Sequence, residues 1–222
     1  MKDVQTEFAQ LNQFTQTGFV KAGKITLLLG PMFSGKSSLL LNEIDKATIA
    51  KIPCCIVRPK TDTREFFTHS KWEYRSFDSY NVADLKDVPA AQYDVICIDE
   101  GQFFDSLLQS IEWVKMGKRV FISALNGDRH QTEWKATQEM IPLVDEIVFL
   151  KAVCSKCGSY EAAFSYKVND TSADQVDIGG SAESFIALCR DCLQIENAKR
   201  ESERNQYQFE DFSNVACAQT EK

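Results

Sequence analysis

Short apolar runs and longer periodic stretches follow each other in turn along this chain. Five runs have the length of buried strands, at residues 25–29, 54–57, 95–98, 120–125 and 147–150. The segments between them contain helical patterns. Strands that alternate with helices predict an α/β fold with a mainly parallel central sheet covered on both faces.

Two helical patterns are clear. The first is expected to begin at Ser37 and to bury one face, made by Leu40, Leu41, Ile44 and Thr48. The second places Phe104, Leu107, Leu108, Ile111 and Val114 on one face. A glycine in the left-handed conformation commonly ends a helix, so the second helix is expected to stop at Gly117.

The local composition and periodicity of the sequence divide the chain into four parts. Residues 1–22 are rich in Gln and Thr with weak periodicity, which predicts an N-terminal tail. Residues 23–150 carry the strand and helix patterns of an α/β nucleotide-binding domain, and residues 151–193 form a small domain with two cysteine pairs. Residues 194–222 are charged and poor in apolar residues, which predicts a helix that continues into a C-terminal tail.

The charge and composition exclude several classes of partner. The 25 basic and 32 acidic residues give a net charge of -7, which opposes attachment to a nucleic acid polymer. No apolar run approaches the roughly 20 residues of a membrane helix, and the N-terminus has neither a signal peptide nor a transit peptide pattern. We therefore expect a cytoplasmic protein that does not bind membranes, with its eight cysteines as thiols or metal ligands.

A phosphate-binding loop follows the first predicted strand. The segment from Gly30 to Ser37 matches G-x-x-x-x-G-K-[ST] between a strand and a helix, the context that the motif requires. The residues expected to cradle the phosphates of ATP are Gly30, Pro31, Met32, Phe33, Ser34, Gly35, Lys36 and Ser37. In this motif Lys36 reaches the β/γ oxygens, and the Ser37 hydroxyl is a ligand of Mg²⁺.

Two acids end the third apolar run. Asp99 leaves the strand end and is expected to hold Mg²⁺, while Glu100 is free to accept a proton. If that proton came from water, the chain would be an ATPase. If it came from a substrate hydroxyl, the chain would be a kinase.

Four cysteines have the spacing of a structural zinc site. Cys154 and Cys157 form one C-x-x-C pair, and Cys189 and Cys192 form the other. Four thiolates close a tetrahedral Zn²⁺ site without an open position for water. The alternatives are a zinc ribbon that binds nucleic acid and a pair of disulfides.

These motifs together resemble the type II thymidine kinases over residues 23–193. The resemblance rests on the phosphate-binding loop, the Asp62-Thr-Arg64 triplet, the segment from Asp99 to Phe104, the four cysteines, and Ile178-Gly-Gly180. It implies a RecA-like P-loop fold with a zinc-held lasso domain, a homotetramer, and transfer of the ATP γ-phosphoryl to the 5′-hydroxyl of thymidine. Such a reaction belongs to pyrimidine deoxynucleoside salvage for DNA synthesis.

The resemblance also implies a role for single residues. Glu100, Arg64 and Lys36 correspond to catalytic residues, and Asp62, Arg64, Asp99 and Gln102 to residues beside the phosphates and Mg²⁺. The positions that correspond to thymidine contacts are Met32, Phe103, Leu125, Arg129, Trp134, Gln175, Val176, Asp177, Ile178, Gly179 and Phe185.

Three features of the sequence depart from the family pattern. Arg129, followed by His130, stands where many members carry an aromatic residue, and Phe185 stands where Tyr is usual. One extra residue separates Gly180 from Cys189. These departures concern the grip on the base and leave the phosphate chemistry untouched.

Two alternative functions fit parts of the sequence. A DExx-type ATPase acting on nucleic acid would use Glu100 to activate water, but such a machine usually needs a second RecA-like lobe and a basic track. A zinc-ribbon adaptor without activity would not need the intact loop and both acids.

Overall fold

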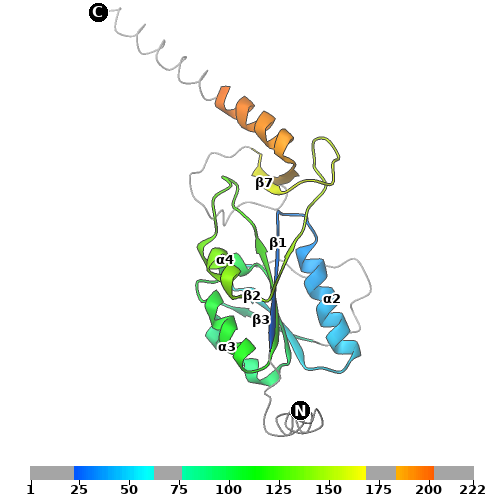
Figure 1. The fold of residues 1–222 in the computed structure, drawn as a ribbon, viewed down its shortest axis with the longest axis vertical. Helices are drawn as coiled ribbons and strands as arrows, with labels where there is room; N and C mark the ends of the chain where they lie inside the picture. The colour runs from blue at the N-terminus through cyan, green and yellow to red at the C-terminus, as the bar shows by residue number, and fades with distance from the viewer. Residues whose placement is uncertain (1–22, 63–76, 169–183, 203–222) are drawn as a thin grey trace, which may run out of the picture. The chain divides into compact units, whose positions relative to one another are not determined.

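The computed structural model describes residues 23–62, 77–168 and 184–202 (Figure 1). The chain divides into two compact units. Of the described residues, the first unit comprises 23–30, 35–62, 77–126 and 133–150, and the second comprises 31–34, 127–132, 151–168 and 184–202. Among the described residues, no helix combines the length and the apolar character needed to cross a membrane.

A six-stranded parallel sheet forms the centre of the first unit. Its strands lie in the order β3-β2-β4-β5-β1-β6, and all neighbours pair in parallel. Their bounds are β1 (Lys24–Gly30), β2 (Cys54–Pro59), β3 (Asp78–Val82), β4 (Val95–Ile98), β5 (Arg119–Leu125) and β6 (Glu146–Phe149). The predicted α/β class with a mainly parallel central sheet is confirmed.

Helices cover both faces of this sheet, as Figure 1 shows. Helix α2 (Lys36–Ile49) lies on one face, and α3 (Ser110–Lys115) and α4 (Lys135–Met140) lie on the other. The alternation of β1 explains the two cores, because Leu27 packs into the cluster on the α3 and α4 side and Leu28 into the cluster under α2. Short 3₁₀ helices span Leu85–Asp87, Ala90–Gln92, Gly101–Phe103, Leu107–Gln109 and Ile141–Leu143.

The second predicted helix is wrong in its first half. Regular α-helix begins only at Ser110, and Leu108 is exposed rather than buried. The chain turns before that point, where the Ser106 hydroxyl accepts a hydrogen bond from the Leu85 backbone N–H at 3.0 Å. Serine side chains that bond to backbone groups compete with helix formation. The helix does end near Gly117, which has a φ of 82°.

Strand β6 is an edge strand, so the burial expected for residues 147–150 is wrong although the strand is there. Ile147 and Phe149 are 44% and 49% exposed. The periodicity that predicts a strand is a local property. Burial depends on what covers the strand, and the last strand of a sheet has a neighbour on one side only.

The second unit contains a two-stranded antiparallel sheet and a helix. Strands β7 (Phe164–Lys167) and β8 (Phe185–Leu188) pair with each other. A helix follows over residues 190–202, here called the C-terminal helix. This helix begins directly after Cys189, four residues before residue 194, where the sequence predicted the C-terminal segment to start. A small core of its own, including Ala162, Tyr166 and Leu188, holds this unit together.

Candidate functional site

The carboxyl ends of three parallel strands meet at one edge of the sheet. Gly30 at the end of β1 pairs with Leu125 at the end of β5, and Ile98 at the end of β4 pairs with Ile122. Asp99 and Glu100 follow Ile98 directly. Ligands of open parallel sheets bind outside these strand ends, so the phosphate loop and both acids start from the expected edge.

The flanks of the phosphate loop belong to the first unit. Gly35 adopts a left-handed conformation with a φ of 84° and caps α2 without a side-chain hydrogen bond. The first-turn amides of α2 therefore carry no side-chain cap, and such amides attract anions. The Lys36 ammonium donates to the Gly30 carbonyl oxygen at 3.1 Å, which keeps the cation beside the loop.

The tip of the loop, Pro31–Ser34, groups with the second unit. Ser34 Oγ donates to the Pro31 carbonyl at 2.8 Å, and the Met32 N–H donates to Ser165 Oγ at 2.9 Å. Phe33 has a positive φ of 66° and an exposed ring. The loop conformation is therefore fixed both locally and by a residue from β7.

Asp99 is the centre of a buried polar cluster. It is 2% exposed, and its Oδ1 accepts hydrogen bonds from Ser37 Oγ at 3.1 Å, from the Glu100 N–H at 3.1 Å and from Ser123 Oγ. The cluster brings the predicted pair Ser37 and Asp99 into direct contact. Hydroxyl and carboxylate oxygens are the hard ligands that Mg²⁺ prefers, so this pair fits the ion.

Glu100 is held in a tight turn after β4. Its φ is 53°, and a Cβ on the next residue, Gly101, would approach Ile122 Cγ2 to 2.7 Å. Gln102 Nε2 donates to Glu100 Oε2 at 2.6 Å, and Gln102 Oε1 accepts from the Leu125 N–H at 3.0 Å. The Gln102 carboxamide thus connects the Glu100 carboxylate to the end of β5.

Two of the predicted thymidine contacts lie together in the first unit. The rings of Phe103 and Trp134 meet edge to face, with centroids 5.5 Å apart. Trp134 is buried, whereas Phe103 is partly exposed. The pair comes from the turn after β4 and from the residue that precedes α4.

Arg129 lies in a turn that Asp128 organises within the second unit. The Asp128 carboxylate accepts from the backbone N–H groups of His130 at 2.7 Å and Thr132 at 2.9 Å, and from the Thr132 hydroxyl. Burial alone would raise the pKa of Asp128, but these donors outweigh it and lower the pKa below the usual value of an aspartate. Arg129 is itself buried, and its Nε donates to His130 Nε2 at 3.2 Å.

The remaining predicted residues are not all described. Asp62 Oδ2 lies 3.9 Å from Arg58 Nη1. Phe185 is the first residue of β8 and pairs with Lys167 of β7. Arg64 and the lasso residues 175–179 lie outside the described residues.

The four cysteines come together in the second unit. Their Sγ atoms lie within 4.8 Å of one another, and those of Cys157 and Cys189 are 3.7 Å apart. A tetrahedral site with Zn–S bonds of about 2.3 Å requires sulfur atoms about 3.8 Å apart, so the cluster fits Zn²⁺.

The thiols of this cluster do not share one environment. Burial opposes ionisation of Cys154, but the N–H groups of Cys189, Cys157 and Lys156 outweigh it and lower the pKa of this thiol to about 6. Partial burial and the neighbouring thiols raise the pKa of Cys192 to about 12. A cation is what allows four such thiols to ionise together.

Three residues of these clusters were not identified from the sequence. Ser123 interrupts an apolar run with one hydroxyl, and that single polar residue was the available signal. Gly101 lies in the segment from Asp99 to Phe104, but the sequence assigns it no role of its own. Ser165 lies 133 residues from Met32, so no local pattern points to their contact.

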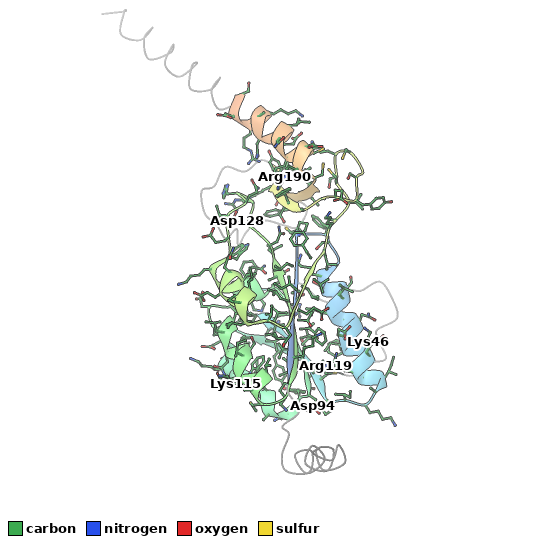
Figure 2. The ribbon with its side chains drawn as sticks, in the orientation of Figure 1. Lys46, Asp94, Lys115, Arg119, Asp128 and Arg190 are labelled. Atoms are coloured by element: carbon green, nitrogen blue, oxygen red, sulfur yellow. The ribbon has the colours of Figure 1, made fainter. Side chains whose placement is uncertain are left out.

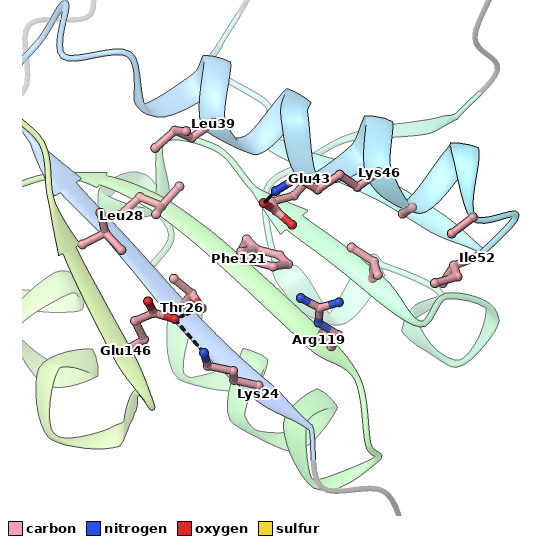
Figure 3. Close-up of a pocket in the computed structure, with 14 residues that line it drawn as sticks. Lys24, Thr26, Leu28, Leu39, Glu43, Lys46, Ile52, Arg119, Phe121 and Glu146 are labelled. Atoms are coloured by element: carbon pink, nitrogen blue, oxygen red, sulfur yellow. Dashed lines mark hydrogen bonds and ion pairs between the residues drawn. The ribbon is translucent and has the colours of Figure 1, made fainter.

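A cavity of about 510 Å³ lies on the α2 face of the sheet (Figure 3). Leu28 and Phe121 line it, and the ion pair between Lys24 and Glu146 at 2.6 Å borders it. None of the residues that the sequence analysis assigned to a site lines this cavity.

Comparison with known proteins agrees with this geometry. Residues 23–193 match the thymidine kinase family. Thymidine kinase 1 of Dictyostelium discoideum is 35% identical over 180 residues, which cover 77% of this chain and 78% of the relative. The thymidine kinase of Sheeppox virus (strain KS-1) is 33% identical over 178 residues, 78% of this chain and 98% of the relative. The thymidine kinase of Pseudothermotoga lettingae is 34% identical over 178 residues, 77% and 95% of the two chains.

Proposed function

Because the chain belongs to the thymidine kinase family, we propose that it transfers the γ-phosphoryl group of ATP to the 5′-hydroxyl of thymidine, giving dTMP and ADP. The observation that carries this proposal is the strand-end cluster. The phosphate loop begins there, Ser37 contacts Asp99, and Glu100 is the next residue along the chain. Phosphoryl transfer depends on positioning and charge neutralisation, and this cluster offers both.

The loop and Asp99 are assigned to Mg-ATP. The amides of the loop and of the first turn of α2 bind the phosphates, and Lys36 leaves the Gly30 carbonyl to reach the β/γ oxygens. Ser37 and Asp99 hold Mg²⁺, which neutralises charge on the phosphates when it is bound. Asp62 and Arg64 are assigned to the same phosphates by their match to the family pattern.

Glu100 is assigned the role of general base. Its carboxylate accepts the proton of the thymidine 5′-hydroxyl as the oxygen attacks the γ-phosphorus. The Gln102 carboxamide already donates to one oxygen of this carboxylate, so it fixes the direction of the other. Contact of Gln102 with a phosphate stays a prediction from the resemblance.

The thymine side rests on the family pattern. Met32, Phe103, Leu125 and Trp134 would surround the base, with Arg129, Phe185 and the backbone of residues 175–179. The edge-to-face contact of Phe103 and Trp134 supports an aromatic wall at this place. The guanidinium plane of Arg129 would replace the aromatic ring of other members, since Arg also stacks on flat π systems.

The assembly and the surroundings of the enzyme are also proposed. We infer a homotetramer, which the exposed Ile147 and Phe149 of edge strand β6 support as a surface for a second copy. We infer a cytoplasmic enzyme with a structural Zn²⁺, because the cysteines of the described residues are thiols. Residues 23–150 would bind the nucleotide and residues 151–193 the nucleoside, with tails on both sides.

A substrate panel tests the proposal. The protein is incubated with Mg-ATP and each of the four deoxynucleosides, and nucleoside monophosphates are separated from ADP. We expect dTMP from thymidine, one for each ADP, and little product from the purine nucleosides. ADP release that does not depend on the nucleoside and increases with single-stranded DNA would support the alternative function, an ATPase that acts on nucleic acid.

A further inference from the structure

Strand β7 is held on one face by the C-terminal helix. Successive side chains of a strand point to opposite faces, so Phe164 and Tyr166 share a face and Ser165 points away from it. The guanidinium of Arg190, at the start of the helix (Figure 2), lies 4.7 Å from the Phe164 ring centroid. That of Arg200 lies 4.4 Å from the Tyr166 ring centroid. One helix therefore places a cation over both aromatic rings of this face.

Arg200 also holds the backbone of β7. Its Nη2 donates to the Lys167 carbonyl oxygen at 2.6 Å, and the Tyr166 hydroxyl donates back to the Glu196 carbonyl oxygen at 3.5 Å. Tyr166 is 5% exposed and belongs to the small core of the second unit. Position 200 lies beyond residue 193, where the match to the thymidine kinase family ends.

The opposite face of β7 holds the phosphate loop. Ser165 is 4% exposed, and its hydroxyl accepts the Met32 N–H at 2.9 Å. Met32 lies in the middle of the loop tip, Pro31–Ser34, which groups with the same compact unit as β7 and the C-terminal helix. A shift of β7 would therefore change the position of a loop amide.

We propose that Arg200 is a positioning residue for the phosphate loop. It fixes β7 from one face, so that Ser165 on the other face keeps the Met32 amide in place. A loop that is ordered before the nucleotide arrives loses less conformational entropy on binding, and binds more tightly. The inference rests on the proposed function only in taking Mg-ATP as the ligand of the loop.

A double-mutant cycle tests the path from Arg200 to the loop. Binding of Mg-ATP without thymidine is measured by calorimetry for Arg200→Ala, Ser165→Ala, the double variant and Lys199→Ala. Both Arg200→Ala and Ser165→Ala are expected to weaken the neutral hydrogen bond between the Met32 N–H and Ser165 Oγ, which predicts a Kd for Mg-ATP raised roughly three- to tenfold in each. If Arg200 acts through Ser165, the double variant binds no more weakly than the weaker single variant. Lys199→Ala removes an exposed cation from the same helix and is expected to match the wild type.

Steady-state kinetics give a second readout. The KM for ATP is expected to rise by the same factor as Kd, with kcat changed less than about twofold, because Arg200 acts on loop order and the proton acceptor Glu100 is unchanged. Single-variant losses that multiply in the double variant, or an Arg200→Ala variant that binds like the wild type, would overturn the proposal. Arg200→Lys replaces Arg200→Ala in the same cycle if the alanine variant does not fold.

The outcomes separate this inference from the proposed function. A wild-type protein that forms no dTMP but shows the non-additive ATP-binding pattern would refute the thymidine kinase activity and support the role of Arg200. Normal dTMP formation with additive ATP-binding losses would support the thymidine kinase activity and refute the role of Arg200.

Discussion

Gln102 connects the Glu100 carboxylate to β5, and Gln102→Met removes that connection while keeping the length of the side chain. Gln102 is 5% exposed, and its side chain donates one hydrogen bond to Glu100 at 2.6 Å and accepts one from the Leu125 N–H at 3.0 Å. A hydrogen bond to a charged group contributes about 1.5–3 kcal/mol, and we take the lower end because Glu100 is partly exposed. The unpaired Leu125 N–H adds about 1 kcal/mol.

The expected loss of unfolding free energy is therefore about 2–3 kcal/mol, which lowers Tm by roughly 5–10 °C in a chain of this size. A carboxylate without its orienting partner samples unproductive directions, so kcat is expected to fall about ten- to hundredfold. If Gln102 acts through Glu100 alone, the KM for ATP stays close to its wild-type value, whereas a raised KM for ATP would support the phosphate contact that the family pattern implies. Calorimetry and a dTMP product assay measure the two effects.

The control is Gln92→Met, the same chemical change at an exposed residue. It should leave both Tm and kcat unchanged. If Gln102→Met lowered Tm but left kcat as it is, Gln102 would support the fold and would not orient Glu100.

Two further predictions concern the framework and the metal. Tyr93→Phe removes a buried hydroxyl that donates to Asp78 at 2.5 Å, and should cost about 1–3 kcal/mol in a urea unfolding titration, whereas Tyr160→Phe at a 79% exposed residue should cost nothing. Equal effects of the two changes would contradict this account. Cys192→Ser should reduce the zinc measured by mass spectrometry from one ion per chain to almost none, while Cys54→Ala, in β2, should retain the ion. Full zinc in the first variant would exclude the four-cysteine site.

The sequence predicts the central strands well because their signal is local. Strands β1, β4 and β5 are buried on both faces, so each appears as a nearly continuous apolar run. The phosphate loop and the two acids are equally local, since each follows its strand within one or two residues. Parallel pairing then brings them to one edge without further information.

What the sequence does not predict depends on distant neighbours. Strand β3 is polar and has no buried residue, and β7 alternates two aromatic residues with two polar ones, so neither forms an apolar run. The hydrogen bond between Ser165 and Met32 joins residues 133 positions apart. The cation–π contact of Arg200 with Tyr166 joins a charged helix to a strand. Only the folded chain brings these partners together.

The central claim is that Glu100 accepts the proton while Asp99 and the loop hold Mg-ATP. Glu100→Gln is nearly isosteric and removes the proton acceptor. We expect this variant to bind Mg-ATP within about twofold of the wild type in calorimetry, and to form dTMP about two to four orders of magnitude more slowly in a quenched single-turnover assay. A rate of dTMP formation equal to that of the wild type would contradict the assignment of Glu100.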